Sequence, residues 1–307
     1  MGLDSNGVKF FLYAKSLGVD FSETATIGRQ YLYIEPSGLK EILSSFNYQV
    51  DDKNLELIFK ENDGYAETFF RYFGANITDS FDYSNYEGST HIHDMNLPIP
   101  DIYKDQYNVV IDGGALEHIF NFPVAIKNCM EMIKTNGYYI GMTIGNNFMG
   151  HGFYQFSPEL FFSIFTKENG YELVKIIAVD TSSNQQWFSI KDPNELKERV
   201  TLVNSSPLYL FVIAKKIDSS VEIFKPAPQQ SDYELMWQDG SSEEKMKFFS
   251  VNDQVQKITL GNLIKTLGNL IKKSIPKYIK RELKRLFLKD KLTLFDPKFF
   301  TPFNPID

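Results

Sequence analysis

Short apolar runs that end at or near a glycine or an aspartate alternate with helical segments over most of this 307-residue chain. Each of these runs has the length of a β-strand, and they lie at 24–28, 76–82, 89–95, 107–112, 138–144, 171–180 and 207–216. Helices are predicted at 5–17, 37–46, 64–75, 121–136 and 157–170. Strands that alternate with helices favour an α/β fold, a doubly wound and mostly parallel sheet with helices on both faces.

Local signals place the ends of several helices. Ser37 and Asn121 are predicted to cap the helices that follow them, and Pro123 suits a first helical turn. Apolar residues then recur at helical spacing, at Ile126, Cys129, Met130 and Ile133. Gly137 is predicted to end this helix.

Acidic residues follow several of the predicted strands. A doubly wound sheet binds its ligands at the carboxyl ends of its strands, where the strand order reverses. Gly28 with Arg29, Asp82, Asp94 and Asp112 all lie at such ends. A single aspartate there is more often a turn or capping residue. Four strand ends in register predict a shared crevice.

Composition indicates a soluble protein of the cytoplasm. The only cysteine, Cys129, excludes an internal disulfide framework and falls on the apolar face of a predicted helix, where it is expected in the core. The first residues lack the basic and apolar regions of a signal peptide. No apolar run approaches the roughly 18 to 20 residues of a membrane-spanning helix.

Charge is distributed unevenly. Residues 255–307 carry 12 Lys and Arg against 4 Asp and Glu, a net charge of +8, whereas residues 1–254 carry 20 and 35, a net charge of −15. An acidic main body argues against a nucleic-acid footprint, because phosphate binding needs clustered Lys and Arg. We therefore predict no nucleic-acid partner and expect any polyanionic partner to meet the C-terminal segment.

These changes in composition predict three parts: a domain over 1–216, a polar linker or insertion over 217–254, and a basic amphipathic helical segment over 255–307. The last part repeats the heptad TLGNLIK at 259–265 and 266–272. Such a helix can fold back on its own domain, lie on an anionic membrane surface as a peripheral contact at its inner face, or pair with a partner helix. The sequence leaves these three alternatives open.

The stretch "YNVVIDGGALEHIF" (107–120), together with the helix from Asn121 and the turn "KTNGYY" (134–139), resembles the class I S-adenosylmethionine-dependent methyltransferases. The similarity is to members found among bacterial sugar and polysaccharide genes, and in element order it covers residues 22–216. The resemblance implies a Rossmann-like fold and S-adenosylmethionine as the cofactor.

Residue roles follow from the resemblance where positions match. Asp82, with Tyr83 beside it, is expected to bind the ribose hydroxyls. Asp94 with Met95 is expected at the adenine, and Asp112 beneath the methionine part of the cofactor. The first loop, "TIGRQYLYIEPSG", departs from the glycine-rich family pattern and keeps Gly28 alone. Arg29 or Gln30 is then available for the cofactor carboxylate, with Arg29 suited to two-point binding.

Two histidines are candidates for a general base in methyl transfer, because the imidazole pKa lies near neutrality. His118 and His151 both follow predicted strands on the acceptor side, although a loop histidine is more often a structural hydrogen-bond partner. Substrate contacts are predicted from polar residues near them, namely Glu117, Asn146, Asn147 and Tyr154. His91 and His93 lack a third ligand at zinc spacing, so the sequence predicts no metal site.

The sequence thus predicts an enzyme that transfers a methyl group to a hydroxyl, less often an amine, of a sugar or related small metabolite or glycan. Two other hypotheses remain. A non-catalytic binding or scaffold protein on the same fold is favoured by the reduced first loop. A nicotinamide-dependent oxidoreductase is disfavoured, because no G-x-G-x-x-G follows the first strand.

Overall fold

The computed structural model describes residues 2–182, 186–231, 233 and 293–306. The chain divides into two compact units, one of residues 1–189, 206–228 and 303–307 and one of residues 190–205 and 229–302. Most of the predicted basic segment, residues 255–292, lies outside the described residues. Its described end, 293–306, forms turns and a short strand.

Helices and strands follow the alternation seen in the sequence. The helices are α1 (Ser5–Ser16), α2 (Pro36–Ser45), α3 (Asp52–Lys60), α4 (Glu67–Tyr72), α5 (Phe122–Met132), α6 (Pro158–Ile164) and α7 (Pro193–Leu196). The strands are β1 (Gly2–Leu3), β2 (Glu23–Ile27), β3 (Tyr31–Leu32), β4 (Ile77–Asp82), β5 (His91–Ile92), β6 (Tyr107–Asp112), β7 (Ile133–Asn146), β8 (Tyr171–Asp180), β9 (Trp187–Ile190), β10 (Leu208–Lys216) and β11 (Phe300–Phe303).

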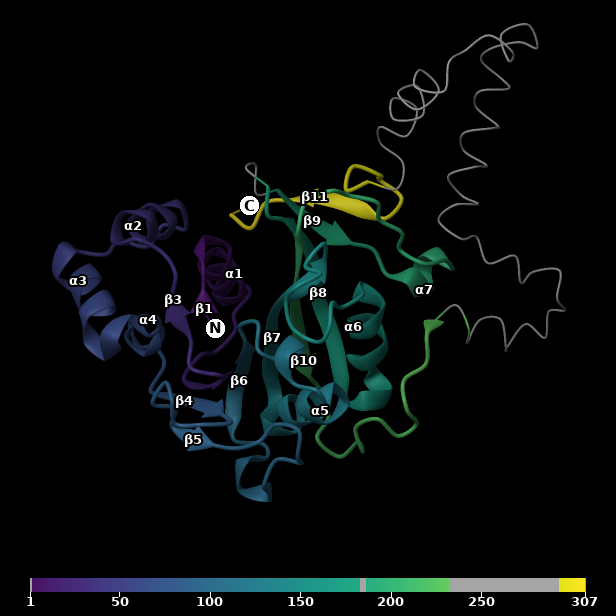
Figure 1. The fold of residues 1–307 in the computed structure, drawn as a ribbon, viewed down its shortest axis with the longest axis horizontal. Helices are drawn as coiled ribbons and strands as arrows, with labels where there is room; N and C mark the ends of the chain where they lie inside the picture. Colours follow the sequence, from purple (N-terminus) through teal and green to yellow (C-terminus); the bar gives the residue numbers. More distant parts are fainter. Residues whose placement is uncertain (1, 183–185, 232, 234–292, 307) are drawn as a thin grey trace, which may run out of the picture. The chain divides into compact units, whose positions relative to one another are not determined.

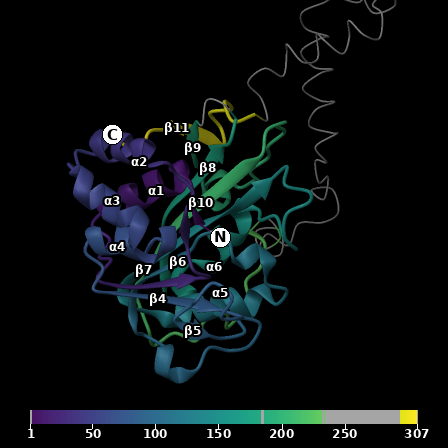
Figure 2. The same ribbon diagram turned by 60° about the vertical axis from the view of Figure 1, so that its left-hand side comes forward.

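One large sheet organises the first unit. From β9 to β5 its strand order is β9-β8-β10-β7-β6-β2-β4-β5, and Figure 2 shows it running from β5 at the bottom to β9 at the top. β7, β6, β2, β4 and β5 are parallel, whereas β10 runs antiparallel to both of its neighbours, β7 and β8. The order reverses between β2 and β6, which makes their carboxyl ends the switch point of a doubly wound, Rossmann-like fold. The predicted fold class is confirmed.

Helices cover both faces of this sheet. Figure 1 shows α1 to α4 on one side and α5 and α6 on the other. The α1 side holds a large apolar core in which the rings of Phe11 and Phe21 lie 4.2 Å apart. On the α6 side, Phe165 packs 5.0 Å from the ring of Tyr139 in β7. β6 is buried on both faces, as expected for a central parallel strand.

Two helix boundaries and one capping bond differ from the prediction. Ser37 does not cap α2, which begins at Pro36 after Glu35. Asn121 precedes α5 without a side-chain capping bond. α5 ends at Met132, not at Gly137, because Ile133 is already extended and pairs with Tyr107.

Gly137 lies instead at a shift in register between β6 and β7. A side chain at this position is excluded by the backbone, because a Cβ would lie 2.7 Å from the carbonyl oxygen of Asn108. The glycine therefore permits a close approach between two strands rather than a helix end.

The second unit contributes α7 among its described residues. The Asp192 carboxylate caps this short helix by accepting the amide of Asn194, 2.7 Å away. The Lys191 amide donates to the carbonyl of Phe299 at 3.0 Å. Within the part of the chain that is described, no helix combines the length and apolarity needed to cross a bilayer.

Candidate active site

A cavity of about 400 Å³ opens at the carboxyl ends of β6 and β7. Gly113 and Gly114, which follow β6, form part of its lining together with Met142 and Thr143 of β7. The remaining walls come from the N-terminal segment, the loop that follows β7, and β10. The cavity lies beside the switch point, where a doubly wound sheet binds its ligands.

Glu117 lines this cavity from a 3-10 turn, Leu116–His118. The residue is 1% exposed, and the Thr143 hydroxyl donates to its Oε2 at 3.0 Å. Burial raises the pKa of Glu117 above its ordinary value, because a carboxylate loses its hydration there. A cation or a hydrogen-bond donor in the cavity could therefore interact strongly with the Glu117 carboxyl group, which water solvates poorly.

The loop after β7 is fastened to the backbone of Glu117. The amide of Phe153 donates to the Glu117 carbonyl at 2.8 Å, and the Tyr154 amide approaches the same oxygen at 3.3 Å. Gly152 sits at the crossing with φ +68°, and a Cβ there would lie 2.7 Å from that oxygen. Only glycine suits this contact, which holds His151 over the cavity.

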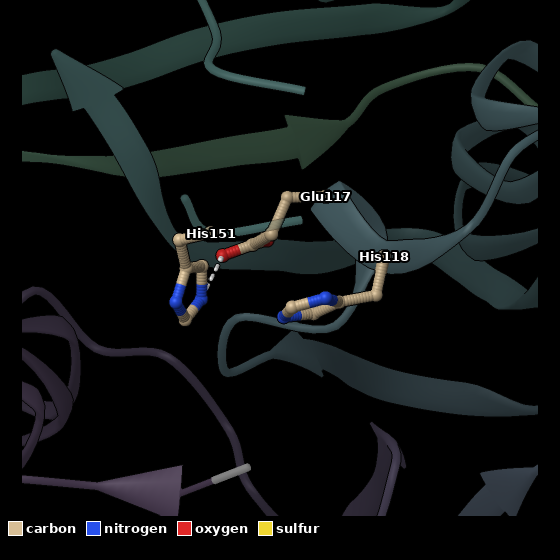
Figure 3. Close-up of side chains that lie close together, drawn as sticks. All are labelled: Glu117, His118 and His151. Carbon is tan, nitrogen blue, oxygen red and sulfur yellow. Dashed lines mark ion pairs between the residues drawn. The ribbon is translucent and has the colours of Figure 1, made fainter. Parts of the chain in front are cut away.

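His118 and His151 meet at the cavity from these two segments. Figure 3 shows both imidazoles beside the Glu117 carboxylate. Their ring centroids lie 4.8 Å apart, and His151 Nε2 lies 4.0 Å from Glu117 Oε1. His118 is exposed, but partial loss of its hydration first, and the neighbouring His151 second, lower its pKa. A neutral imidazole can accept a proton from an acceptor hydroxyl or bind a metal ion.

Asp112 ends β6 directly before the lining residue Gly113 and is not itself among the residues that line the cavity. Its carboxylate is 1% exposed and accepts the amides of Ala115 and Leu116 at 2.8 and 3.2 Å, with the Tyr139 hydroxyl at 3.3 Å. Burial and then Glu117 raise the pKa of Asp112 to about 7. The residue therefore holds the turn that presents Glu117 and His118. Its predicted contact with a cofactor stays a prediction.

The loop after β2 occupies the other side of the switch point. Gly28 has φ +69°, and its amide donates to the Phe81 carbonyl of β4 at 2.7 Å. Gln30 is 2% exposed, and its side-chain amide donates to the carbonyls of Ile27 and Gly28 at 2.9 and 3.0 Å. Its carbonyl oxygen has no hydrogen-bond partner and lies against Gly113, 2.0 Å from where a Cβ would stand.

Arg29 turns toward neighbours on its own side of the sheet. The guanidinium pairs with Glu67 at 2.5 Å, donates to the Glu87 carbonyl at 2.8 Å, and stacks 3.9 Å over the ring of Tyr65. These three contacts bind the α4 region to the β4–β5 connection. Arg29 can bind a cofactor carboxylate, as predicted from the sequence, only through an N–H group of the guanidinium that these three contacts do not use.

Asp82 and Tyr83 lie at the end of β4, as predicted. The Asp82 carboxylate is half-buried and meets the amide of Ser84 at 3.4 Å, and Tyr83 is exposed. Asp94 accepts both the backbone and side-chain nitrogens of Asn96, which lower its pKa. Met95 is buried. Asp82 therefore ends β4 and Asp94 follows β5, both at the carboxyl ends of strands on the β2 side of the switch point.

The predicted substrate contacts divide into two groups. Glu117 lines the cavity, but Asn146, Asn147 and Tyr154 are not among its lining residues. The Asn147 side chain donates to the Ser206 carbonyl at 2.8 Å, and the Tyr154 hydroxyl donates to the Phe120 carbonyl at 2.6 Å. These contacts hold the loop after β7 in place around the cavity.

The other two histidines have structural surroundings. His91 Nε2 lies 3.3 Å from Asp79, and the Tyr103 hydroxyl meets its Nδ1 at 3.2 Å. His93 Nε2 approaches the Leu97 carbonyl at 3.2 Å. Cys129 is fully buried in α5, as predicted, and burial raises its pKa well above the ordinary value.

Sequence reasoning missed one wall of the cavity, which the N-terminal segment supplies through Gly2, Asp4, Gly7 and Tyr33. Gly2 lies in β1, which pairs with β3, and a Cβ there would stand 2.1 Å from the Tyr31 carbonyl oxygen. Asp4 caps α1 by accepting the Gly7 amide at 2.8 Å. The sequence alone could predict that Asp4 caps a helix, but it could not predict that Asp4 lies beside the cavity.

No protein-family model and no curated protein matches the chain. Solved structures do align with it. The Burkholderia thailandensis 1,6-didemethyltoxoflavin-N1-methyltransferase, with 1,6-didemethyltoxoflavin and S-adenosylhomocysteine bound, aligns at TM-score 0.39 and 9% identity, over 70% of this chain and 78% of its own. TehB of Haemophilus influenzae aligns at TM-score 0.33 and 13% identity, over 66% of this chain and 61% of its own.

The branched-chain polyamine synthase of Thermus thermophilus, in complex with N4-aminopropylspermidine and 5'-methylthioadenosine, aligns at TM-score 0.35 and 10% identity. The alignment covers 69% of this chain and 56% of the synthase. At these identities and TM-scores, no residue role passes from these proteins to this chain.

Proposed function

We propose that the chain is an S-adenosylmethionine-dependent methyltransferase that acts on a small acceptor in the cavity. The observation that supports this most is that two groups of residues lie on the two sides of the switch point, one suited to the cofactor and one to the acceptor. Gly28, Asp82 and Asp94 follow β2, β4 and β5, whereas the cavity with Glu117 and its two histidines opens after β6 and β7. Cofactor and acceptor then meet over Gly113.

The residues after β2, β4 and β5 fit this cofactor. The unpartnered Gln30 oxygen at the switch point suits an ammonium donor such as that of the methionine part. The Asp82 carboxylate can accept two ribose hydroxyls at once. The bound cofactor supplies an electrophilic methyl group, and the protein's own task is to orient the acceptor and exclude water.

The acceptor that we propose is a hydroxyl of a sugar or a related small metabolite. Its proton would pass to His118 or His151, which the cavity holds beside each other. Phe148 stacks on Tyr209 at 5.3 Å and offers an apolar wall against a sugar face. A role in surface polysaccharide biosynthesis, in the cytoplasm, extends the same proposal.

Calorimetry tests the cofactor. S-adenosylmethionine and S-adenosylhomocysteine are each expected to bind the full-length protein at one site. Asp82→Ala should weaken this binding at least tenfold, because a hydrogen bond to a charged group contributes roughly 1.5 to 3 kcal/mol. Asp52→Ala, which removes an exposed acid from α3, should leave it unchanged. Absence of binding at millimolar cofactor would overturn the proposal.

Ligand binding without catalysis is the second candidate function, and Gln30 is the observation that favours it. Its side chain fills the space over Gly113 into which the methionine part of a cofactor would extend. If the side chain blocks that space, Gln30→Gly gains S-adenosylmethionine binding that the unchanged protein lacks. If it acts as a ligand, the same substitution weakens binding. Calorimetry on both proteins decides between the two functions.

A further inference from the structure

We propose that Glu117, His118 and His151 bind a divalent transition-metal ion at the cavity, with zinc as the reference ion. One ligand atom from each side chain lies within 4.8 Å of the other two. Figure 3 shows the three side chains converging from two segments, the 3-10 turn after β6 and the loop after β7. Residues that are far apart in the sequence thus present three donor atoms to one point.

The ligand chemistry suits such an ion. Two imidazoles and one carboxylate form a common catalytic zinc set and also the facial triad of other transition metals. Neighbouring ligands around zinc lie about 3.4 Å apart when the bonds measure about 2.1 Å. The observed separation of 4.0 Å between His151 Nε2 and Glu117 Oε1 requires only a small closure. Both histidines are exposed, so their rings have room to turn.

The surroundings of Glu117 supply the support that a metal ligand needs. Thr143 Oγ1 donates to Oε2 and leaves Oε1 directed at the histidines. A hydrogen bond to the oxygen that does not bind the metal orients a ligating carboxylate. Among the described residues, His151 is the only ion-pair partner that the carboxylate has. A buried charge of this kind gains most from a cation.

The backbone also fixes the distance between the two segments. The Phe153 amide donates to the Glu117 carbonyl, and Gly152 permits that approach. His151 therefore stays beside Glu117 through main-chain contacts that do not depend on a ligand. The ligand set is largely formed in advance, which lowers the entropic cost of binding.

This inference rests on the proposed function for its consequence. An ion held by three protein ligands keeps a coordination position open toward the cavity. An oxygen atom of the acceptor hydroxyl can take that position, which would orient the hydroxyl within the cavity. A bound ion would lower the pKa of that hydroxyl, and its proton would then pass to solvent water, so that the two histidines serve as metal ligands in place of the base role that they have in the metal-free cavity.

Metal binding to the chelator-treated, full-length protein tests the site without any cofactor. Cobalt(II) serves as the visible probe and zinc(II) as the calorimetric one. We expect one ion per chain and a visible absorption band typical of low-coordinate cobalt. His118→Ala, His151→Ala and Glu117→Gln should each weaken binding at least tenfold, whereas His93→Ala, an imidazole outside the cavity, should have no effect.

Several results would overturn the site: no stoichiometric binding by the unchanged protein, an affinity in the three variants equal to that of the unchanged protein, or a loss in His93→Ala equal to the loss in those variants. Circular dichroism and thermal melting confirm that each variant folds. The readout is independent of S-adenosylmethionine. Metal binding without cofactor binding therefore contradicts only the proposed function, and cofactor binding without metal binding contradicts only the metal site.

Discussion

At the scale of single residues, the main finding concerns Asp112 and Glu117. The predicted cofactor ligand Asp112 is enclosed by three donors, and the adjacent acid of the same stretch, Glu117, faces the cavity. The sequence predicts acids at a strand end, but it does not distinguish an acid that holds a turn from one that meets a ligand. Both carboxylates are 1% exposed, so their partners make the difference. Asp112 accepts two backbone amides of the turn, whereas Glu117 accepts one hydroxyl and lines the cavity.

Asp112 leads to a prediction about stability and pH. Its pKa is raised from 3.8 to about 7, so the folded protein binds the proton more tightly than the unfolded chain does. Stability from this residue is therefore present below about pH 4 and is lost as pH rises through about 7. Asp112→Asn should remove this loss, on the order of a few kcal/mol.

Urea unfolding of the metal-free protein between pH 4.5 and 7.5 measures this effect. Asparagine keeps an oxygen that can accept the amides of Ala115 and Leu116. Burial also raises the pKa of Glu117, and the two neighbouring carboxyls titrate together, so the comparison measures the loss of Asp112 from this pair. Parallel stability profiles for the two proteins would show that Asp112 does not titrate as expected.

At the scale of elements, the periodic segments were predicted well and the irregular ones were not. β6 was predicted at its observed bounds, since a buried central strand is a continuous apolar run. α3 was missed, because only Leu55 and Ile58 are buried on it. The early end of α5 was missed because pairing with β6, a contact distant in sequence, extends the chain from Ile133.

The loop after β7 gives an element-scale prediction with a matched control. Gly152→Ala places a Cβ 2.7 Å from the Glu117 carbonyl at φ +68°, which should cost roughly 1 to 3 kcal/mol of stability and displace His151. Gly150→Ala lies in the same loop with no atom within 4 Å of the added Cβ. Thermal melting should separate the two variants.

Activity gives a second readout for these glycines, once an acceptor is known. Gly152→Ala should lower kcat/KM because the two segments of the cavity separate, while Gly150→Ala should resemble the unchanged protein. Equal melting temperatures and equal activities would mean that the contact between Gly152 and Glu117 does not hold the cavity together.

At the scale of the whole molecule, the uneven charge allows a test of one of the three alternatives for the C-terminal segment, contact with an anionic membrane surface. Residues 255–307 carry a net charge of +8 beside a strongly acidic main body. Full-length protein should bind anionic vesicles more strongly than zwitterionic ones, and added salt should weaken the binding. The substitutions Lys277→Glu, Lys280→Glu and Lys284→Glu, made together, should abolish it.

A control with the same change in charge uses Lys53, Lys60 and Lys167, which are exposed on the main body. Replacing these three lysines by glutamate should leave vesicle binding nearly intact. Equal losses in the two triple variants would assign the binding to net charge alone and exclude a dedicated C-terminal contact. Cosedimentation with vesicles measures the full-length protein and the two triple variants in one experiment.

The sequence by itself determined the central strands and most of the helices, with their order, because hydrophobic periodicity and strand-end residues are local properties of the chain. It therefore indicated the doubly wound fold and the edge of the sheet where ligands bind. Only the tertiary structure decided which residues meet there. Glu117 and His118 join His151 through main-chain contacts, Gln30 lies over Gly113, and the N-terminal segment closes one wall. These contacts depend on strand register and loop conformation, and both are determined by interactions between residues that are far apart in the sequence.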